Sequence, residues 1–296
     1  MRQDGDGVNT ERNENKELPC VLINDHFQNF KGYQIPRAQL VIADIPYNVG
    51  NNAYGSNPSW YIGGDNKNGV SELAGKSFFD TDENFKPAEF MHFCSRLMIN
   101  EPKESGKAPC MIVFCSFEQQ FYLIELAKNY GINNYINLIF RKNFSAQVLK
   151  ANMRVVGNSE YALILYRNKL PKFNNNGKMI FNVMDWESDN DYLYEKIHPT
   201  QKPVKLLERL ISIFTDDGDV VIDPVAGSGS TLVAANNLKR KAYGFEIKKN
   251  FYKDAVKWIE KCKTIHGEIE KQGYSNTLMK LQQKQNTLFD QLQETS

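Results

Sequence analysis

The stretch Val220-Val221-Ile222-Asp223-Pro224-Val225-Ala226-Gly227-Ser228-Gly229-Ser230-Thr231 decides the fold of this 296-residue chain. Its β-branched beginning predicts a strand, its glycines predict a tight turn, and the Ala/Leu/Val-rich residues that follow predict a helix. Together they form a cradle for a nucleotide-type ligand, because glycines admit close approach and a helix N-terminus offers free N–H groups. The next predicted strand, Ala242–Phe245, ends before Glu246, where a carboxylate is placed to hold two ribose hydroxyls.

The spacing of the glycines argues against two common nucleotide sites. The third glycine of a dinucleotide fingerprint falls at Leu232, so NAD is disfavoured. The chain has no G-x-x-x-x-G-K-[ST] sequence, so an ATP-type phosphate loop is disfavoured as well. On this stretch alone, a glycine-rich turn that only packs a helix against a sheet remains an alternative.

Short apolar runs alternate with amphipathic stretches along most of the chain. The runs that predict strands are Cys20–Ile23, Leu40–Ala43, Met111–Cys115, Tyr135–Phe140, Tyr161–Tyr166, Val220–Ile222 and Ala242–Phe245. The stretches that predict helices are Ala88–Asn100, Glu118–Asn129, Val204–Phe214, Thr231–Leu238 and Phe251–Lys263. This alternation predicts a Rossmann-like α/β domain, with a mostly parallel sheet of seven strands and helices on both faces.

The composition restricts the class of protein. A 41% apolar chain of formal net charge +1 can bury a sizeable core and carries no overall basic charge. Its five cysteines form no C-x-x-C pair and no metal-ligand spacing, which predicts reduced thiols and no metal. No stretch has the apolar length of a signal peptide or a membrane span, so we expect a cytoplasmic protein that does not contact membranes.

We expect the chain to have three parts. Residues 1–17 predict a disordered tail, residues 18–264 a single domain, and residues 265–296 a polar helix or tail. Two stretches inside the domain break the alternation of strands and helices. Residues 48–84 predict a long loop at the functional site, because loops of this length in compact domains tend to be lids or binding elements. Residues 168–197 are Asn-rich and predict an inserted recognition element.

A second motif follows the strand predicted for Leu40–Ala43. In Asp44-Ile45-Pro46-Tyr47, an acid at the strand end precedes a proline that pins the backbone and an aromatic ring. By itself this motif is also typical of an ordinary strand-to-loop turn in which the aspartate is a cap.

Together these motifs resemble those of the β-class amino-methyltransferases of DNA, over residues 18–263. Asp44-Ile45-Pro46-Tyr47 resembles the family's D-P-P-Y motif, with isoleucine in place of the first proline. Residues 223–231 are similar to its D-P-F-x-G-S-G-T loop, and His198-Pro199-Thr200-Gln201-Lys202-Pro203 matches its H-P-T-Q-K-P segment. The D-P-P-Y-like motif precedes the glycine loop, which is the reverse of the order in release-factor glutamine methyltransferases.

The resemblance implies a circularly permuted methyltransferase fold that binds S-adenosylmethionine and needs no metal. It implies methyl transfer to the N6 amino group of adenine in double-stranded DNA, since cytosine enzymes of the family more often have Ser-Pro-Pro-Tyr. The Asp44 carboxylate and the Ile45 carbonyl would accept the amino hydrogens, Pro46 would fix the backbone, and Tyr47 would stack on the flipped-out base. The alternatives are an N4-cytosine methyltransferase and a catalytically inactive DNA-binding module.

The same resemblance implies the cofactor contacts. Asp223 would hold the methionine amino group, Glu246 the ribose hydroxyls and Asp25 the adenine amino group. Lys202, together with Thr200, would contact the carboxylate of the cofactor. The glycine loop would pass under the methionine part, and its remaining contact residues would be Pro224, Ala226, Gly227, Ser228, Gly229 and Thr231.

The segment between Ile139 and Asn182 is strongly basic. It contains eight Lys and Arg residues and one acid, Glu160, so its formal charge is +7 in a chain of net charge +1. Interleaved aromatic residues favour a face that follows DNA phosphates, with a solvated basic stretch as the alternative. The residues expected to contact DNA are Arg141, Lys142, Lys150, Arg154, Lys169 and Lys172.

The C-terminal tail contains Gln285-Asn286-Thr287-Leu288-Phe289, which resembles the Gln-x-x-Leu-Phe peptide by which bacterial replication and repair proteins bind the sliding clamp. Leu288 and Phe289 would fill an apolar groove, and Gln285 would bind at its rim. In the alternative, Leu281 and Leu288 lie on one face of a helix that docks on the domain. Titration of the tail peptide against a clamp distinguishes the two. A second copy of the chain is a further candidate partner.

Overall fold

The computed structural model describes residues 18–47, 85–143, 147–150, 153, 155–190, 192–198 and 200–294, with the backbone alone for 147–150 and 285–294. The tail expected for residues 1–17 and the loop expected for residues 48–84 lie outside this range, as does Arg154.

Ten strands and seven helices occur in the described residues. The strands are β1 (Cys20–Ile23), β2 (Leu40–Asp44), β3 (Cys110–Cys115), β4 (Asn134–Arg141), β5 (Gln147–Lys150), β6 (Val155–Gly157), β7 (Ser159–Tyr166), β8 (Val183–Asp185), β9 (Val220–Asp223) and β10 (Lys241–Phe245). The helices are a 3-10 helix (Phe27–Tyr33), α1 (Pro87–Leu97), α2 (Phe117–Lys128), α3 (Val204–Phe214), α4 (Ser230–Asn237), α5 (Lys249–Gln272) and α6 (Tyr274–Glu294).

Eight of the strands form one sheet, in the order β1-β10-β9-β2-β3-β7-β4-β8, and β5 pairs with β6 in a separate sheet. The first five strands of that order are parallel, β7 runs antiparallel to β3 and β4, and β8 runs parallel to β4. All seven predicted strands are present, so the predicted α/β fold with a mostly parallel sheet is confirmed. The additional β8 has three residues, which is too short for a periodic signal in the sequence.

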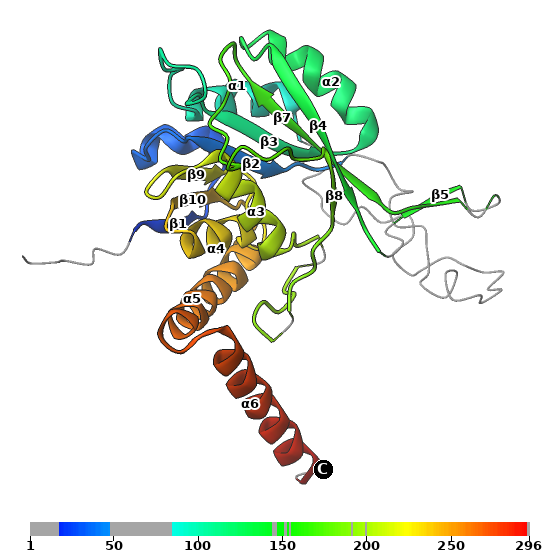
Figure 1. Ribbon diagram of the computed structural model, residues 1–296, viewed down its shortest axis with the longest axis vertical. Helices are drawn as coiled ribbons and strands as arrows, with labels where there is room; N and C mark the ends of the chain where they lie inside the picture. Colours follow the sequence, from blue (N-terminus) through cyan, green and yellow to red (C-terminus); the bar gives the residue numbers. More distant parts are fainter. Residues whose placement is uncertain are drawn as a thin grey trace, which may run out of the picture.

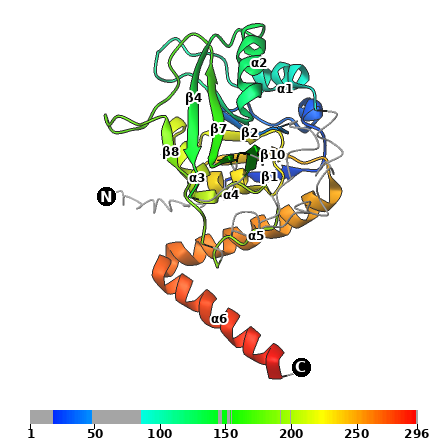
Figure 2. The same ribbon diagram turned by 90° about the vertical axis from the view of Figure 1, so that its right-hand side faces the viewer.

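Helices cover both faces of the sheet (Figures 1 and 2). The alternation of side chains along β2 separates the two cores. Leu40 and Ile42 belong to the cluster that includes α3, α4 and α5, whereas Val41 and Ala43 belong to the cluster that includes α1 and α2. A strand that is buried on both faces requires the continuous apolar run that the sequence shows.

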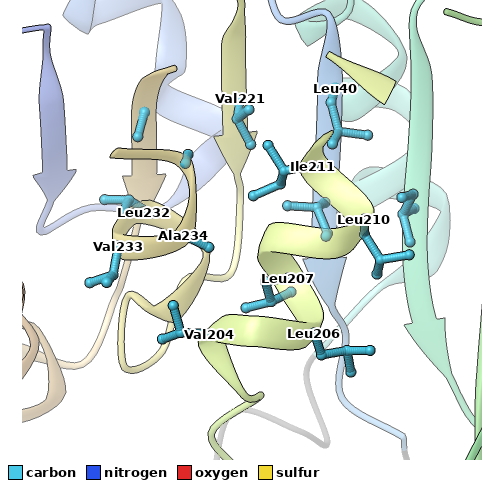
Figure 3. Close-up of a cluster of buried hydrophobic side chains, with 14 of the residues drawn as sticks. Leu40, Val204, Leu206, Leu207, Leu210, Ile211, Val221, Leu232, Val233 and Ala234 are labelled. Atoms are coloured by element: carbon cyan, nitrogen blue, oxygen red, sulfur yellow. The ribbon is translucent and has the colours of Figure 1, made fainter. Parts of the chain in front are cut away.

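Helix α3 has the bounds that the sequence predicts, because its apolar residues recur at helical spacing over its whole length. In the close-up of this core, Ile211 lies between Val221 of β9 and Leu40 of β2 (Figure 3). Full burial of such an aliphatic side chain contributes about 1.5–3 kcal/mol. Helix α3 therefore fixes the segment that precedes it, which carries His198 and Lys202, against the sheet.

Two glycines, one in the predicted cradle and one in the neighbouring strand β10, stand where other side chains pack closely. Gly229, which precedes α4, has a φ of 79°, and a Cβ atom there would lie 2.7 Å from Ile259 Cδ1. A Cβ atom on Gly244 of β10 would lie 2.7 Å from Leu232 Cδ1. The glycines thus allow α4 to pack closely against α5 and β10.

The parallel strands bring the ends of three sequence motifs to one edge of the sheet. Asp44 ends β2, Asp223 ends β9, and Glu246 follows β10. Because β7 runs in the opposite direction, Glu160 reaches the same edge from near the start of its strand. This carboxyl edge is where open α/β sheets bind their ligands.

Helix α5 continues past residue 264 to Gln272, and α6 follows after Gly273. Leu278 and Leu281 of α6 pack against the core, while the rest of α6 extends away from the sheet in both views (Figures 1 and 2). Gln285, Leu288 and Phe289 lie in α6, where the side chains are outside the described part of the chain, so the clamp contact stays a prediction. Among the described residues, no helix has the length and apolarity needed to span a membrane.

Candidate functional site

The Asp44-Ile45-Pro46-Tyr47 motif begins at the end of β2 and is held by β3 and α2. The Ile45 N–H donates to the Phe114 carbonyl at 3.2 Å, and the Ile45 side chain is buried in the core on the α1–α2 side. Gln119 Nε2 donates to the Pro46 carbonyl at 2.7 Å. The backbone of the motif is therefore fixed from both sides, although isoleucine replaces the first proline of the family pattern.

The Asp44 carboxylate has one engaged oxygen and one open oxygen. Lys202 Nζ contacts Asp44 Oδ2 at 2.5 Å. Asp44 Oδ1 is buried and has no hydrogen-bond partner among the residues that the structure describes. A buried acceptor without a partner costs about 1–3 kcal/mol, so this oxygen is suited to a donor that arrives with a ligand.

Glu160 contacts three groups around Asp44. Its Oε1 accepts from the Tyr47 hydroxyl at 2.9 Å and from Lys202 Nζ at 2.7 Å, and its Oε2 pairs with Lys142 Nζ. The Lys142 ammonium also lies 4.4 Å from the centre of the Trp186 ring. We call Asp44, Glu160, Lys142 and Lys202 the four-charge cluster.

Burial and the neighbouring lysines shift the carboxylate pKa values of this cluster in opposite directions. Burial raises the pKa of Asp44, the positive charge of Lys202 lowers it, and Glu160 raises it further. Burial would also raise the pKa of Glu160, but Lys202 and Lys142 outweigh that effect and hold it at about 2. Burial raises the pKa of Tyr47 well above its usual range, as do Asp44 and Glu160, so its hydroxyl stays protonated and donates.

Glu246 closes the glycine loop onto the end of β10. Its Oε2 accepts from the Gly227 N–H at 3.0 Å, and its Oε1 accepts from the Lys248 N–H at 2.7 Å. The Ala226 N–H donates to the Phe245 carbonyl at 2.9 Å, and Asn24 Nδ2 donates to the Glu246 carbonyl at 2.8 Å. Glu246 thus holds the loop in place and has lone pairs left for further donors.

Asp223 is buried between Asp44 and Glu246 at the carboxyl edge of the sheet. It accepts from the Val225 N–H at 3.0 Å. Burial raises its pKa to about 7, against the lowering effect of its hydrogen bonds from Thr231 and Val225, and the charges of Asp44 and Glu246 act in the same direction as burial. A cationic group is the partner that this carboxylate would gain most from binding.

The other residues predicted for the cofactor lie at the borders of this region. Asp25 accepts from the Tyr33 hydroxyl at 2.6 Å and from Asn29 Nδ2 at 2.9 Å, which lowers its pKa. Thr200 Oγ1 lies 3.1 Å from His198 Nδ1. Pro224, Ala226, Gly227 and Ser228 form the turn between β9 and α4, in which Ser228 is buried.

A family model for DNA methylases, of the N6/N4 methyltransferase type, matches residues 38–257. The chain belongs to this family. It is a DNA methyltransferase, and S-adenosylmethionine is the methyl donor that the family uses. The match spans the Asp44 motif, the glycine loop and Glu246, which are the parts that the structure brings to one edge.

Curated relatives and solved structures are similar to this DNA methyltransferase. The DNA adenine methyltransferase YhdJ of Escherichia coli is 26% identical, covering 82% of this chain and 83% of that protein. The type II methyltransferase M2.DpnII of Streptococcus pneumoniae is 27% identical, covering 83% and 91%. The M1.HpyAVI–SAM complex (20% identity, 81% and 98% covered) and the cytosine-N4-specific PvuII DNA methyltransferase (16%, 86% and 95%) each align with a TM-score of 0.57.

Several of the basic residues predicted to contact DNA already contact other groups of the protein. Arg141 pairs with Asp185 at 2.6 Å, and Lys142 belongs to the four-charge cluster. Lys172 contacts Asp216 at 2.7 Å and Asp219 at 2.6 Å, and Lys169 Nζ donates to the Lys103 carbonyl. Lys150 lies in β5, where only the backbone is described. The local charge of +7 is thus partly neutralised by acids from outside the segment.

Sequence reasoning did not assign a role to two residues of the site. Glu160 is the only acid of the basic segment, and this isolation is one signal that could have singled it out. Gln119 stands three residues after Ser116, and this S-x-x-Q spacing is that of a capping box. In the structure the Gln119 Oε1 accepts from the Ser116 N–H at 2.9 Å while its Nε2 reaches Pro46. The methyltransferase motif is therefore attached to the start of α2.

We expect Gln119→Ala to lower the methylation rate by roughly tenfold, because the Pro46 carbonyl loses its donor and the motif shifts. Ser116→Ala is the matched control, since it breaks the other half of the same capping box but keeps the bond to Pro46. Both variants should lose about 1 kcal/mol of unfolding free energy in a denaturant titration. Equal methylation rates in the two variants would show that the Pro46 contact has no role in positioning.

Proposed function

We propose that this DNA methyltransferase is site-specific and methylates the N6 amino group of adenine in double-stranded DNA. The observation that carries the proposal is Asp44 Oδ1, a buried acceptor at the carboxyl edge with no partner in the described part of the chain. An exocyclic amino group supplies the N–H donor that this oxygen needs. Aspartate at the head of the motif favours adenine over cytosine, and the relative YhdJ is named an adenine methyltransferase.

Methyl transfer requires that the site increase the nucleophilicity of the target amino nitrogen. The lone pair of the adenine N6 is delocalised into the ring, and acceptors on its hydrogens return electron density to the nitrogen. Asp44 Oδ1 and the Ile45 carbonyl are the acceptors in this proposal. The bound S-adenosylmethionine supplies a methyl group on a positively charged sulfur. The nitrogen would take the methyl group as its bond to the sulfur breaks, leaving a neutral thioether, and would lose one proton, for which the ionised Asp44 carboxylate would be the acceptor.

Tyr47 is the proposed stacking surface for the flipped-out base. Flipping costs a few kcal/mol, and stacking on an aromatic ring returns about 1–3 kcal/mol. The hydrogen bond from the Tyr47 hydroxyl to Glu160 restricts the ring before the base arrives. This preorganisation reduces the entropy that binding would otherwise lose.

On the cofactor side, we assign Asp223 to the methionine amino group. The chemistry of the site fits this group, because Asp223 is a buried carboxylate whose pKa is raised to about 7. Glu246 would hold the ribose hydroxyls, and Asp25 and Thr200 would complete the site at its borders. Glycine-loop contacts would come from Pro224, Ala226, Gly227, Ser228, Gly229 and Thr231. Lys202 contacts Asp44 and Glu160, which supports a role beside the target base.

Double-stranded DNA would lie along the basic segment and the predicted recognition element of residues 168–197. The pair of strands β5 and β6 extends away from the main sheet (Figure 1). We assign Lys150 of β5, and Arg154 from the sequence between the two strands, to phosphates beyond the target base. Arg141 and Lys169 complete this proposed surface. Lys142 and Lys172 contact carboxylates and are mostly buried, so they contribute less, whereas Arg141 is exposed beside Asp185.

We expect DNA affinity to fall steeply with salt concentration. The double variant Lys150→Ala/Arg154→Ala should reduce the slope of log affinity against log salt by about 1 for each phosphate that the protein no longer neutralises. Lys128→Ala, which removes an exposed lysine of α2 outside the segment, is the control and should leave the slope unchanged. An unchanged slope in the double variant would remove the β5–β6 pair from the DNA-binding surface.

We expect DNA from a host that expresses the wild-type chain to contain N6-methyladenine within one sequence context, measured by nucleoside mass spectrometry and methylation mapping. Asp44→Ala should abolish this product and leave the affinity for S-adenosylmethionine within about twofold, because Asp44 contacts the base. Detection of N4-methylcytosine would favour the cytosine alternative. Cofactor binding without any methylated base would favour the inactive DNA-binding module.

We expect cofactor affinity to depend on pH through Asp223. The pKa of about 7 in the free protein means that the carboxyl is protonated at lower pH and must lose its proton to pair with the cofactor amino group. The dissociation constant should rise by up to about tenfold per pH unit as the pH is lowered from near neutrality, in calorimetric titrations. Asp223→Asn should bind more weakly and without this pH dependence. The same pH dependence in Asp223→Asn would assign it to another group.

A further inference from the structure

The four-charge cluster surrounds Asp44, whose Oδ1 would accept a hydrogen bond from the target amino group. Its members come from four separate places in the chain: the end of β2, the start of β7, the residue after β4 and the segment before α3. The side chains of Lys202, Glu160 and Lys142 are only 9%, 8% and 12% exposed. Two carboxylates and two ammonium groups balance to zero charge.

Stability does not explain such a cluster. Buried ion pairs lose about as much free energy in desolvation as they gain in attraction, and apolar residues of similar volume are often at least as stable. The geometry of Lys202 suggests another reason. Its single ammonium contacts Asp44 Oδ2 and Glu160 Oε1, and the rings of Phe114 and Tyr47 lie 5.2 and 5.7 Å from it. The ammonium is thus contacted on several sides, which restricts its movement with Asp44.

A carboxylate has two equivalent oxygens, and rotation exchanges them. With Oδ2 held by Lys202, Oδ1 is the oxygen left without a partner in the described part of the chain and is the one presented to the target amino group. Glu160 binds both Lys202 and the Tyr47 hydroxyl, so it relates the position of the acceptor to the position of the stacking ring.

We propose that Lys202 and Glu160 are positioning residues of the methyl-acceptor site: Lys202 keeps Asp44 ionised with Oδ1 presented to the amino group, and Glu160 fixes Lys202 and Tyr47. This inference rests on the proposed function of Asp44. It assigns Lys202 to the base side of the site, where the sequence resemblance implied a contact with the cofactor carboxylate.

Lys202 and Glu160 shift the pKa of Asp44 in opposite directions. Burial raises the pKa of Asp44, Lys202 lowers it and Glu160 raises it. The other groups that face Asp44 are Tyr47, Asp223 and Cys115. Loss of Lys202 leaves the carboxylates of this edge without their cation, so Asp44 takes up a proton at higher pH. Without the Glu160 charge, Asp44 is the one carboxylate of the described residues that Lys202 contacts, so Asp44 stays ionised to lower pH.

The test compares Lys202→Met and Glu160→Gln in the full chain. The single-turnover methylation rate of duplex DNA is measured from mildly acidic to mildly basic pH with saturating S-adenosylmethionine. Because the reaction needs ionised Asp44, the rate falls on the acid side through the Asp44 pKa. We expect the midpoint of this fall to move up by about 1–3 pH units in Lys202→Met and down in Glu160→Gln.

A second measurement makes the test independent of turnover. The Asp44 carboxyl carbon, followed by NMR in ¹³C-labelled protein, should show the same opposite shifts of its titration midpoint. If the chain methylates no DNA, the proposed function fails while this titration still decides the positioning roles. Glu160→Gln exchanges one oxygen for an amide nitrogen and keeps a hydrogen-bond acceptor at this position, so it remains informative if Lys202→Met does not fold.

Arg240→Met is the matched control for the loss of a buried cation. Arg240 has an 8% exposed side chain that contacts Asp217 and Thr215 at the opposite edge of the sheet. It should lower the melting temperature without moving either midpoint. Midpoints that stay unchanged in both cluster variants, or that move in the same direction, would overturn the proposal. Affinity for S-adenosylmethionine that falls more than about tenfold in Lys202→Met, with unchanged midpoints, would instead restore the contact with the cofactor carboxylate.

Discussion

The parallel pairing of β1, β10, β9, β2 and β3 is the constraint on which the rest of the site depends. Parallel strands end at the same edge, so residues far apart in the sequence meet without any direct attraction between them. Asp44 and Asp223 are brought to one edge in this way. The helices between the strands supply the burial that keeps this register, and the loops after the strands supply the functional groups.

Several acids buried at one edge raise each other's pKa values, and their negative charges must be balanced by cations or hydrogen bonds. Asp44, Asp223 and Glu246 each have a pKa raised by burial, and each raises that of a neighbour or is raised by one. On one side, Lys202 and Lys142 supply cations from the protein itself. On the other side, around Asp223, the protein supplies hydrogen bonds without a cation in the described residues. This asymmetry separates a half-site whose charges are balanced within the protein from one that awaits a charged ligand.

The sequence predicted the elements of the fold because their signals are local. Seven apolar runs and the periodicity of α3 required no knowledge of neighbours, and the motif resemblance identified Asp44 and the glycine loop. The contacts between elements were not accessible in the same way. Lys202 and Asp44 are 158 residues apart, and their pairing depends on how the segment before α3 packs at the end of β2. For the same reason, a basic segment could be counted, but the acids that neutralise Lys172 and Arg141 could not be located.

The two cores on either side of β2 have a consequence for how this protein can change. Leu40 and Ile42 face α3, and Asp44 continues that face toward Lys202, while Val41, Ala43 and Ile45 face α1 and α2. A deletion or insertion of one residue within β2 would exchange the two faces and point the carboxylate into an apolar core. Only changes of even length preserve the parity of the strand. Within β2, this enzyme can therefore diverge by substitution or by changes of even length, and changes of odd length must fall in the connections around the strand.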